Sequence, residues 1–375
     1  MIGVRKEGRD MRKKCGIDLV VTGVALLVIL PILSLFTGHV AAAEKKVFNW
    51  KFSSHASPGS KALALCQLWW AEQVEKRSNG QIKVKMYWVD ELCGPKEMMI
   101  AVRNRLADVV GNVPSYTPGE APIWNSTYLP FLCAPRVDQS VVIYNLLAKE
   151  SKPFIDEMDK FNCVYGGAYD CPSYNLMGKK PLRNTDDFKG LRIRCSSDVG
   201  AIFKQFGAAP MQVPVTEVYS ALDTGLIDLA AFSFLTFNAY KFDEISKYYI
   251  SDLDISAGAT MYYINKDAWN ELPDNLKKVV QSVIDDSPAF MWDFANLPDR
   301  TNEANRMIKQ RNIEIIHFPK AERAKLMAKA EEVWDSWAKR SGNYENAKRA
   351  LADFVKIRDE VVAKYPQGVP GIKYK

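Results

Sequence analysis

Two arginines stand in a short segment whose residue pattern is typical of a β-strand. In Leu191–Arg194, alternation places both arginines on one face and the two apolar residues on the other. Arg194 would then lie at the carboxyl end of the strand, where a guanidinium can present two parallel N–H donors to a carboxylate. The alternative is that Arg192 and Arg194 form ordinary ion pairs at the surface. The segment is therefore a candidate anion site.

Motifs that would turn such a site into an enzyme are missing. The sequence contains no H-E-x-x-H, G-x-S-x-G, Walker A or G-x-G-x-x-G segment. After residue 43 the only histidines are His55 and His317, and no pair of carboxylates is singled out. We therefore expect neither an enzyme nor a bound cofactor.

The first 43 residues have the features of a secretory signal peptide. Six basic residues precede the apolar run Gly16–Phe36, and small residues follow at Ala41–Ala43. Cleavage there would place the mature chain in the periplasm and lower its net charge from +6 to +3, because six basic and three acidic groups leave. The alternative is an uncleaved anchor, since the run of 21 apolar-rich residues could cross a membrane. So small a net charge does not indicate a nucleic-acid partner.

Six cysteines follow the predicted signal peptide. An oxidising compartment would permit up to three disulfides. Cys163 with Cys171 is the one pair that we favour, whereas Cys66 falls on the inward face of a predicted helix, where a buried free thiol is common.

Alternating strands and helices position these candidates. The pattern predicts a strand at 47–52, a helix at 60–78 that buries Trp70, and a strand at 81–87, which together form a right-handed unit. A helix at 96–106 and a strand at 107–113 place Ser115 and Tyr116 at a carboxyl strand end, where ligands bind in open α/β sheets. This order implies two α/β lobes crossed by long helices. The other predicted segments are helices at 138–149, 214–226, 276–292, 299–311 and 321–341, a helical turn at 186–189, and strands at 162–168, 174–178, 191–194, 227–232 and 313–318.

Several motifs, in order along the chain, resemble the DctP-type solute-binding proteins of TRAP (tripartite ATP-independent periplasmic) transporters. That family has a G-L-K-I-R strand, a G-A-x-P turn, a P-x-x-E-V-Y-x-A-L-x-x-G helix and a strand beginning I/V-D. Further short motifs extend the resemblance over essentially the whole mature chain. The matching segments are Gly190–Arg194, Gly207–Pro210, Pro214–Gly225, Ile227–Asp228, Leu92–Met98, Leu129–Phe131 and Glu271–Pro273.

The resemblance implies an α/β, two-lobed periplasmic solute-binding protein fold with a hinge and long helices crossing both lobes. Lobe I would comprise 44–171 and 256–300, and lobe II 172–255 and 301–375 with the C-terminal helices. The implied function is capture of a small organic acid by a monomer and its delivery to the small and large subunits of a TRAP membrane permease. A periplasmic enzyme acting on a carboxylic acid and a receptor that feeds a sensor kinase remain open as alternatives.

The resemblance also assigns roles to residues of the second lobe. Arg194 falls on the arginine that clamps the ligand carboxylate. Sialic-acid-type members carry a second arginine at a place that falls near Tyr174 here, and others have a glutamate beside a cation where this chain has Ala231. We therefore expect no bound metal ion, and Phe232 or Phe234 as an aromatic wall. The alternative is that both phenylalanines are ordinary core residues.

From the first lobe, the candidate ligand contacts are His55, Glu97, Ser115 and Tyr116. Each could have a purely structural role instead: His55 could cap the adjacent helix, Glu97 could be solvated at a helix start, and Tyr116 could cover the sheet edge. With one strong cation and an aromatic wall, the expected ligand is a monocarboxylate with an apolar or aromatic body rather than a sugar acid.

Overall fold

A computed structural model describes residues 46–375 apart from 60, 172, 296–308 and 370–375. The predicted signal peptide and most of the predicted helix at 299–311 lie outside the described residues. One mixed sheet of five strands and another of six organise the described chain. The α/β class predicted from the sequence is therefore confirmed.

The first sheet has the strand order β2-β1-β3-β10-β4. Strand β1 runs parallel to β2 and β3, whereas β10 runs antiparallel to β3 and β4. Every residue of β10 is buried, so this strand lacks the alternation that reveals a strand in sequence, and it was not predicted. The strands are β1 Phe48–Ser54, β2 Ile82–Tyr87, β3 Val109–Asn112, β4 Cys163–Cys171 and β10 Gly258–Asn265.

Helices cover this sheet, and the first of them carries the predicted core tryptophan. Trp70 is 1% exposed, stacks on Trp50 of β1 and donates from Nε1 to the Gly166 carbonyl at 2.8 Å. The prediction of a buried Trp70 is confirmed. The helical segments are α1 Lys61–Arg77, α2 Met98–Arg103, η2 Pro114–Tyr116, η3 Trp124–Tyr128, α3 Val137–Glu150, α4 Lys152–Lys160, α8 Lys266–Asn270 and α9 Asp274–Ala295.

The second sheet has the strand order β11-β9-β5-β8-β6-β7. Strand β6, which ends at Arg194, runs parallel to β7 and β8, so the carboxyl ends of β6 and β8 lie at the same edge. Arg192, at the other end of β6, is exposed and forms an ion pair with Asp228 at 2.8 Å. The strands are β5 Asn175–Gly178, β6 Arg192–Arg194, β7 Ala209–Met211, β8 Leu229–Phe232, β9 Tyr248–Ser251 and β11 Glu314–His317.

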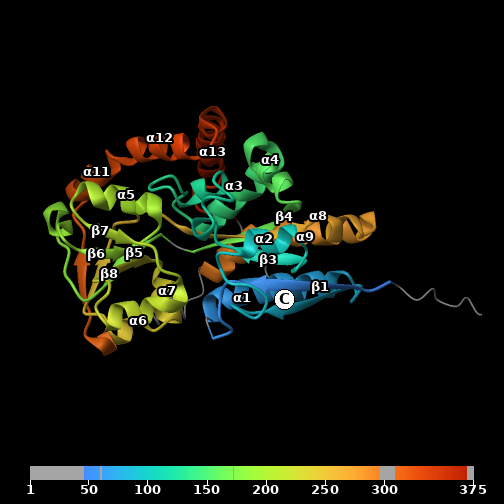
Figure 1. The fold of residues 1–375 in the computed structure, drawn as a ribbon, viewed down its shortest axis with the longest axis horizontal. Helices are drawn as coiled ribbons and strands as arrows, with labels where there is room; N and C mark the ends of the chain where they lie inside the picture. Colours follow the sequence, from blue (N-terminus) through green and yellow to red (C-terminus); the bar gives the residue numbers. More distant parts are fainter. Residues whose placement is uncertain (1–45, 60, 172, 296–308, 370–375) are drawn as a thin grey trace, which may run out of the picture. The chain divides into compact units, whose positions relative to one another are not determined.

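Helices also flank the second sheet, and Figure 1 shows α5 and α6 on opposite sides of it. The helix predicted at 214–226 is divided into a 3-10 turn and a shorter α-helix. The segments are η4 Thr185–Phe188, α5 Ser197–Gln205, η5 Val215–Glu217, α6 Val218–Asp223, α7 Phe234–Ala239, η6 Phe242–Glu244, α11 Lys320–Met327, α12 Ala330–Arg340 and α13 Tyr344–Lys364.

Two segments that connect the sheets are hydrogen-bonded to each other. Between β4 and β5, Tyr174 N donates to the Ser256 carbonyl at 2.6 Å, and between β9 and β10, Ile255 N donates to the Tyr174 carbonyl at 3.2 Å. Helix α12 also contacts elements around both sheets. Arg340 pairs with Asp198 of α5, which flanks the second sheet, and Trp334 donates to the carbonyl of Pro130, which lies between η3 and α3. These contacts fit the predicted arrangement of connecting strands and crossing helices.

The lobe boundaries stay a prediction. Within 301–375, which the sequence places in lobe II, β11 joins the second sheet. In contrast, α13 lies against α3 and α4 of the first sheet (Figure 1), and Ser151 Oγ donates to Asp353 Oδ2 at 2.6 Å. The C-terminal helix is thus attached to the other group of elements.

The predicted disulfide between Cys163 and Cys171 is wrong. These cysteines are the first and last residues of β4, and both thiols are free. An extended strand rises about 3.3 Å per residue, so its two ends are much farther apart than the limit of roughly 7 Å between Cα atoms joined by a disulfide.

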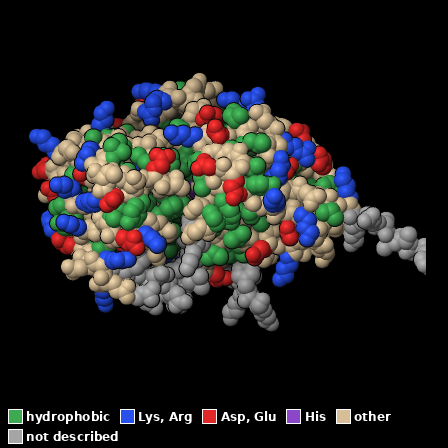
Figure 2. Space-filling model, turned by 60° about the horizontal axis from the view of Figure 1, so that its bottom comes forward, with side chains coloured by type: hydrophobic (Ala, Val, Ile, Leu, Met, Phe, Trp, Pro, Cys, Tyr) green, Lys and Arg blue, Asp and Glu red, His purple; other side chains and the backbone are tan. Residues whose placement is uncertain are grey.

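The surface charges and the composition of the helices concern two further partners, nucleic acid and the membrane. Figure 2 shows Lys and Arg side chains interspersed with Asp and Glu among the described atoms in view, an arrangement unlike the continuous basic region that nucleic-acid binding requires. Within the described part of the chain, none of the helices combines the length and the apolar composition needed to cross a membrane.

Candidate functional site

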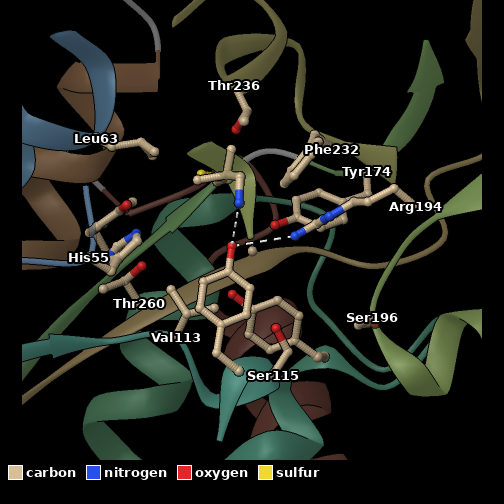
Figure 3. A pocket seen from close by; sticks show the side chains of 16 residues that line it. His55, Leu63, Val113, Ser115, Tyr174, Arg194, Ser196, Phe232, Thr236 and Thr260 are labelled. Atoms are coloured by element: carbon tan, nitrogen blue, oxygen red, sulfur yellow. Dashed lines mark hydrogen bonds between the residues drawn. The ribbon is translucent and has the colours of Figure 1, made fainter. Parts of the chain in front are cut away.

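The carboxyl ends of parallel strands from both sheets meet at one hollow of about 430 Å³, part of it open to solvent (Figure 3). From the first sheet, His55 follows β1 directly and η2 follows β3. From the second sheet, Arg194 ends β6 and Phe232 ends β8. This placement is the one expected for ligand sites in open α/β sheets.

Arg194 is held in place by neutral groups. Its side chain is buried, Nε donates to the Val213 carbonyl at 2.8 Å, and Nη1 donates to the Ala231 carbonyl at 3.3 Å. Its guanidinium carbon lies 3.8 Å from the centre of the Phe232 ring, which is a cation–π contact. Within the described chain, no carboxylate lies within ion-pair distance of this guanidinium. The arginine is thus fixed and charged, with no anion of the protein beside it.

Tyr116 connects the two sides of the hollow. Its hydroxyl accepts from Arg194 Nη2 at 3.4 Å and from Val215 N at 3.2 Å (Figure 3). Beside it, Gln212 Nε2 donates to the Ser115 carbonyl. A tyrosine hydroxyl that accepts two hydrogen bonds still carries a proton, so Tyr116 can also donate to an oxygen atom in the hollow.

His55 contributes a neutral imidazole. The side chain is 3% exposed, and Nδ1 lies 3.0 Å from the Gly111 carbonyl. Burial lowers the pKa of His55 from 6.5 to about 4, although the Gly111 hydrogen bond raises it. The alternative that His55 caps the adjacent helix finds no support, because its hydrogen-bond partner Gly111 belongs to β3.

Six of the eight residues predicted from the sequence line this hollow. They are His55, Ser115, Tyr116, Tyr174, Arg194 and Phe232.

Phe234 and Glu97 lie elsewhere, which corrects their placement at the site. Strand β8 ends at Phe232 and the chain turns into α7, so Phe234 packs edge-on against Tyr249 with ring centres 5.4 Å apart. Glu97 Oε2 accepts from Gly94 N at 2.8 Å at the start of α2, where it borders a separate surface hollow with Glu217.

The sequence analysis missed the remaining lining residues. Several come from β4 and β10, whose burial hides any alternation, and Gly258 of β10 is required because a Cβ there would lie 2.1 Å from Tyr174 Oη. Ser196 could have been identified, since it follows Arg194 by two residues. The missed residues are Leu63, Val113, Tyr128, Tyr169, Cys171, Ser196, Val215, Thr236, Gly258 and Thr260.

The chemistry of the hollow suits binding more than reaction. Of the described residues that line it, Arg194 alone carries a charge at neutral pH, and the walls combine aromatic and aliphatic surface with the hydroxyl groups of four tyrosines, two serines and two threonines. Elsewhere too, the described residues include no cluster of three or more His, Cys, Asp or Glu side chains placed to hold a metal ion.

Comparison with known proteins identifies one family. Residues 52–340 match the sequence model of the bacterial extracellular solute-binding proteins, family 7, named DctP. A solute-binding protein of Albidiferax ferrireducens is 26% identical over 244 residues, which cover 61% of this chain and 68% of that protein. The sialic acid-binding periplasmic protein SiaP of Vibrio cholerae is 25% identical over 271 residues, covering 67% of this chain and 78% of SiaP.

A solved structure shares the fold. The TRAP solute-binding protein of Rhodoferax ferrireducens, crystallised with copurified benzoate, superimposes with a TM-score of 0.75 at 19% identity. The match covers 85% of this chain and 99% of that chain.

Proposed function

The chain belongs to family 7 of the bacterial extracellular solute-binding proteins, the DctP-type receptors of TRAP transporters, and we propose that it captures a small organic acid whose carboxylate binds Arg194. Such a protein is a transport receptor and not an enzyme. We further propose that it acts in the periplasm, where its relative SiaP is named as acting, and that it delivers the acid to TRAP membrane permease subunits.

The observation that carries the proposal is the buried guanidinium of Arg194 without a carboxylate partner among the described residues. Burying an unpaired charge is costly unless a counter-charge accompanies it. A ligand carboxylate would supply that charge and accept directional hydrogen bonds from the guanidinium.

Ser196 supports an anion at the same place. Its hydroxyl is buried, has no hydrogen-bond partner in the described structure and lies at the N-terminus of α5, on the wall of the hollow. The partial positive charge of a helix N-terminus favours an anion. A carboxylate bound to Arg194 would therefore have a second donor available from Ser196.

The rest of the hollow favours an apolar body on the ligand. Leu63, Val113, Val215 and Phe232 give it aliphatic and aromatic walls, and Tyr174 occupies the place near which sialic-acid-type members carry a second arginine. A single cation matches a single carboxylate, and apolar walls stabilise a ligand by about 25 cal/mol per Å² of buried surface. The proposed ligand is therefore a monocarboxylate, with an aliphatic or aromatic body.

Capture by such a receptor requires closure of one side of the hollow on the other. A ligand shifts a protein toward a conformation only when it binds that conformation better. An acid that contacts Arg194 from the second sheet and His55 or Tyr116 from the first meets this condition, because it binds groups from both sides at once.

A panel of acids tests the proposal by isothermal titration calorimetry on the chain from residue 44. We expect micromolar binding of branched aliphatic or aromatic monocarboxylates, and much weaker binding of dicarboxylates and hexuronates. The matched neutral amide of the best acid should not bind, since it lacks the charge that Arg194 requires. Equal binding of acid and amide, or binding of hexuronates alone, would contradict the proposal.

A further inference from the structure

The imidazole of His55 has a defined tautomer. The Gly111 carbonyl can only accept a hydrogen bond, so the atom 3.0 Å from it, Nδ1, must carry the proton. In a neutral imidazole the other nitrogen then bears a lone pair. Nε2 is therefore a hydrogen-bond acceptor and cannot donate.

The Nε2 acceptor of His55 has no hydrogen-bond partner among the described residues. Among the described residues, no donor is paired with Nε2, and the ring lines the hollow. Tyr169 and Thr260, which occupy paired positions on β4 and β10, also line the hollow. A buried acceptor that loses water without gaining a donor costs free energy, so the partner of Nε2 is expected to come from the ligand.

Figure 3 shows His55 on the opposite side of the hollow from Arg194 and Ser196. His55 directly follows β1 of the first sheet. Arg194 ends β6 of the second sheet, and Ser196 lies two residues after it. A ligand whose carboxylate binds Arg194 would thus present its far end to His55.

We propose that His55 Nε2 accepts a hydrogen bond from a hydroxyl or N–H group of the ligand, so that the ligand is a monocarboxylic acid with a donor remote from its carboxylate. This inference rests on the proposed function and narrows the class of acid. A second carboxylate at that end is disfavoured, because its oxygens would face the lone pair of Nε2.

The test compares pairs of acids that differ by one hydroxyl, such as 3-phenylpropionate and 3-(4-hydroxyphenyl)propionate, and 5-hydroxypentanoate with pentanoate. For at least one pair, wild type should bind the hydroxylated acid about 10- to 100-fold more tightly, the range for an unpaired buried polar group. His55→Phe should bind both members of that pair equally while keeping its affinity for the deoxy acid. The control Tyr219→Phe, which alters a hydroxyl near Glu244 and outside the hollow, should keep the preference.

A second measurement needs no variant. The ¹⁵N resonance of His55 Nε2 should move upfield when the hydroxylated acid binds and stay in place with its deoxy partner. Wild-type binding of monocarboxylates without a hydroxyl preference, or a preference that survives in His55→Phe, would overturn this inference alone. Failure of every carboxylic acid to bind would overturn the proposed function as well.

Discussion

The hydroxyl of Tyr116 lies 3.4 Å from Nη2 of Arg194, and this contact joins the two sides of the hollow. Tyr116 ends η2 after β3, and Arg194 ends β6. The same hydroxyl also accepts a hydrogen bond from Val215 N. Tyr116, on the side of the first sheet, is thus bound by two donors on the side of the second. A ligand carboxylate bound to Arg194 would thus lie beside the Tyr116 hydroxyl, which already links the two sides of the hollow.

Removal of the guanidinium should abolish binding. We expect Arg194→Ala to lose about 2–5 kcal/mol of binding free energy, or roughly 30- to 5000-fold in affinity, as expected for one partner of a buried charge pair. Arg194→Lys should retain part of the affinity, because an ammonium keeps the charge but not the two parallel donors. Calorimetry with the best monocarboxylate measures both effects, and circular dichroism checks the fold.

Arg192→Ala is the matched control for this prediction. Arg192 lies two residues before Arg194, and its exposed guanidinium pairs with Asp228. Affinity should therefore change less than 2-fold, in line with the small contribution of exposed ion pairs. Equal losses in Arg192→Ala and Arg194→Ala would indicate damage to β6 and not loss of a carboxylate contact.

Tyr116→Phe should weaken binding to a smaller extent. The variant keeps the ring but removes the acceptor for Arg194 and Val215, and each net hydrogen bond contributes about 0.5–1.5 kcal/mol. We expect affinity to fall roughly 2- to 10-fold. Tyr219→Phe, which alters an exposed hydroxyl near Glu244, serves as the control. Tighter binding by Tyr116→Phe would instead mean that the hydroxyl competes with the carboxylate for Arg194.

Local sequence pattern was sufficient to predict those site residues that lie at or just after the end of a strand. Alternation in Leu191–Arg194 predicted β6, and the end of the strand at 107–113 placed Ser115 and Tyr116 correctly beside the hollow. Arg192 and Arg194, equivalent by alternation, differ in the structure: one is paired at the surface and the other is buried. That difference comes from the position of Asp228 and of β8, which is tertiary information.

Elements buried on both faces could not be predicted in the same way. Strand β10, with the sequence G-A-T-M-Y-Y-I-N, is buried throughout and contributes Gly258 and Thr260 to the hollow. Phe234 shows a different limit: the predicted strand ends correctly at Phe232, but α7, which Ser233 caps and in which Phe234 lies, was not predicted. Strand β10 depends on pairing with β3 and β4, which lie far from it in the sequence.

Chelators should leave ligand binding unchanged. The position at which some family members carry a cation-binding glutamate is Ala231, a buried residue of β8, and its carbonyl already accepts from Arg194 Nη1 at 3.3 Å. A hard cation needs several oxygen ligands and would be repelled by the adjacent guanidinium. Calorimetry before and after dialysis against EDTA should give the same affinity. Restoration of lost binding by stoichiometric calcium would contradict this prediction.

His55 should make the fold sensitive to acid. Its pKa is 6.5 in an ordinary setting and about 4 in the folded chain because of burial. Between these values the unfolded chain binds more protons, so the free energy of unfolding falls as the pH falls. The difference between the two pKa values corresponds to about 3 kcal/mol, lost in full only below pH 4.

Two buried carboxyl groups change the free energy of unfolding with pH in the opposite direction to His55. The pH profile of the wild type alone therefore does not give the contribution of His55. Burial raises the pKa of Asp170 and of Glu157 to about 7. Their protonated forms favour folding at low pH, and this stabilisation is lost as the pH rises from about 4 towards 7. The informative quantity is therefore the difference between wild type and His55→Phe, because both chains retain the two carboxyl groups. Urea unfolding at pH 7.5, 6, 5 and 4.5 should show the wild type losing up to about 2.5 kcal/mol more than the variant. Parallel curves for the two proteins would mean that the imidazole takes up its proton as readily in the folded chain as in the unfolded one.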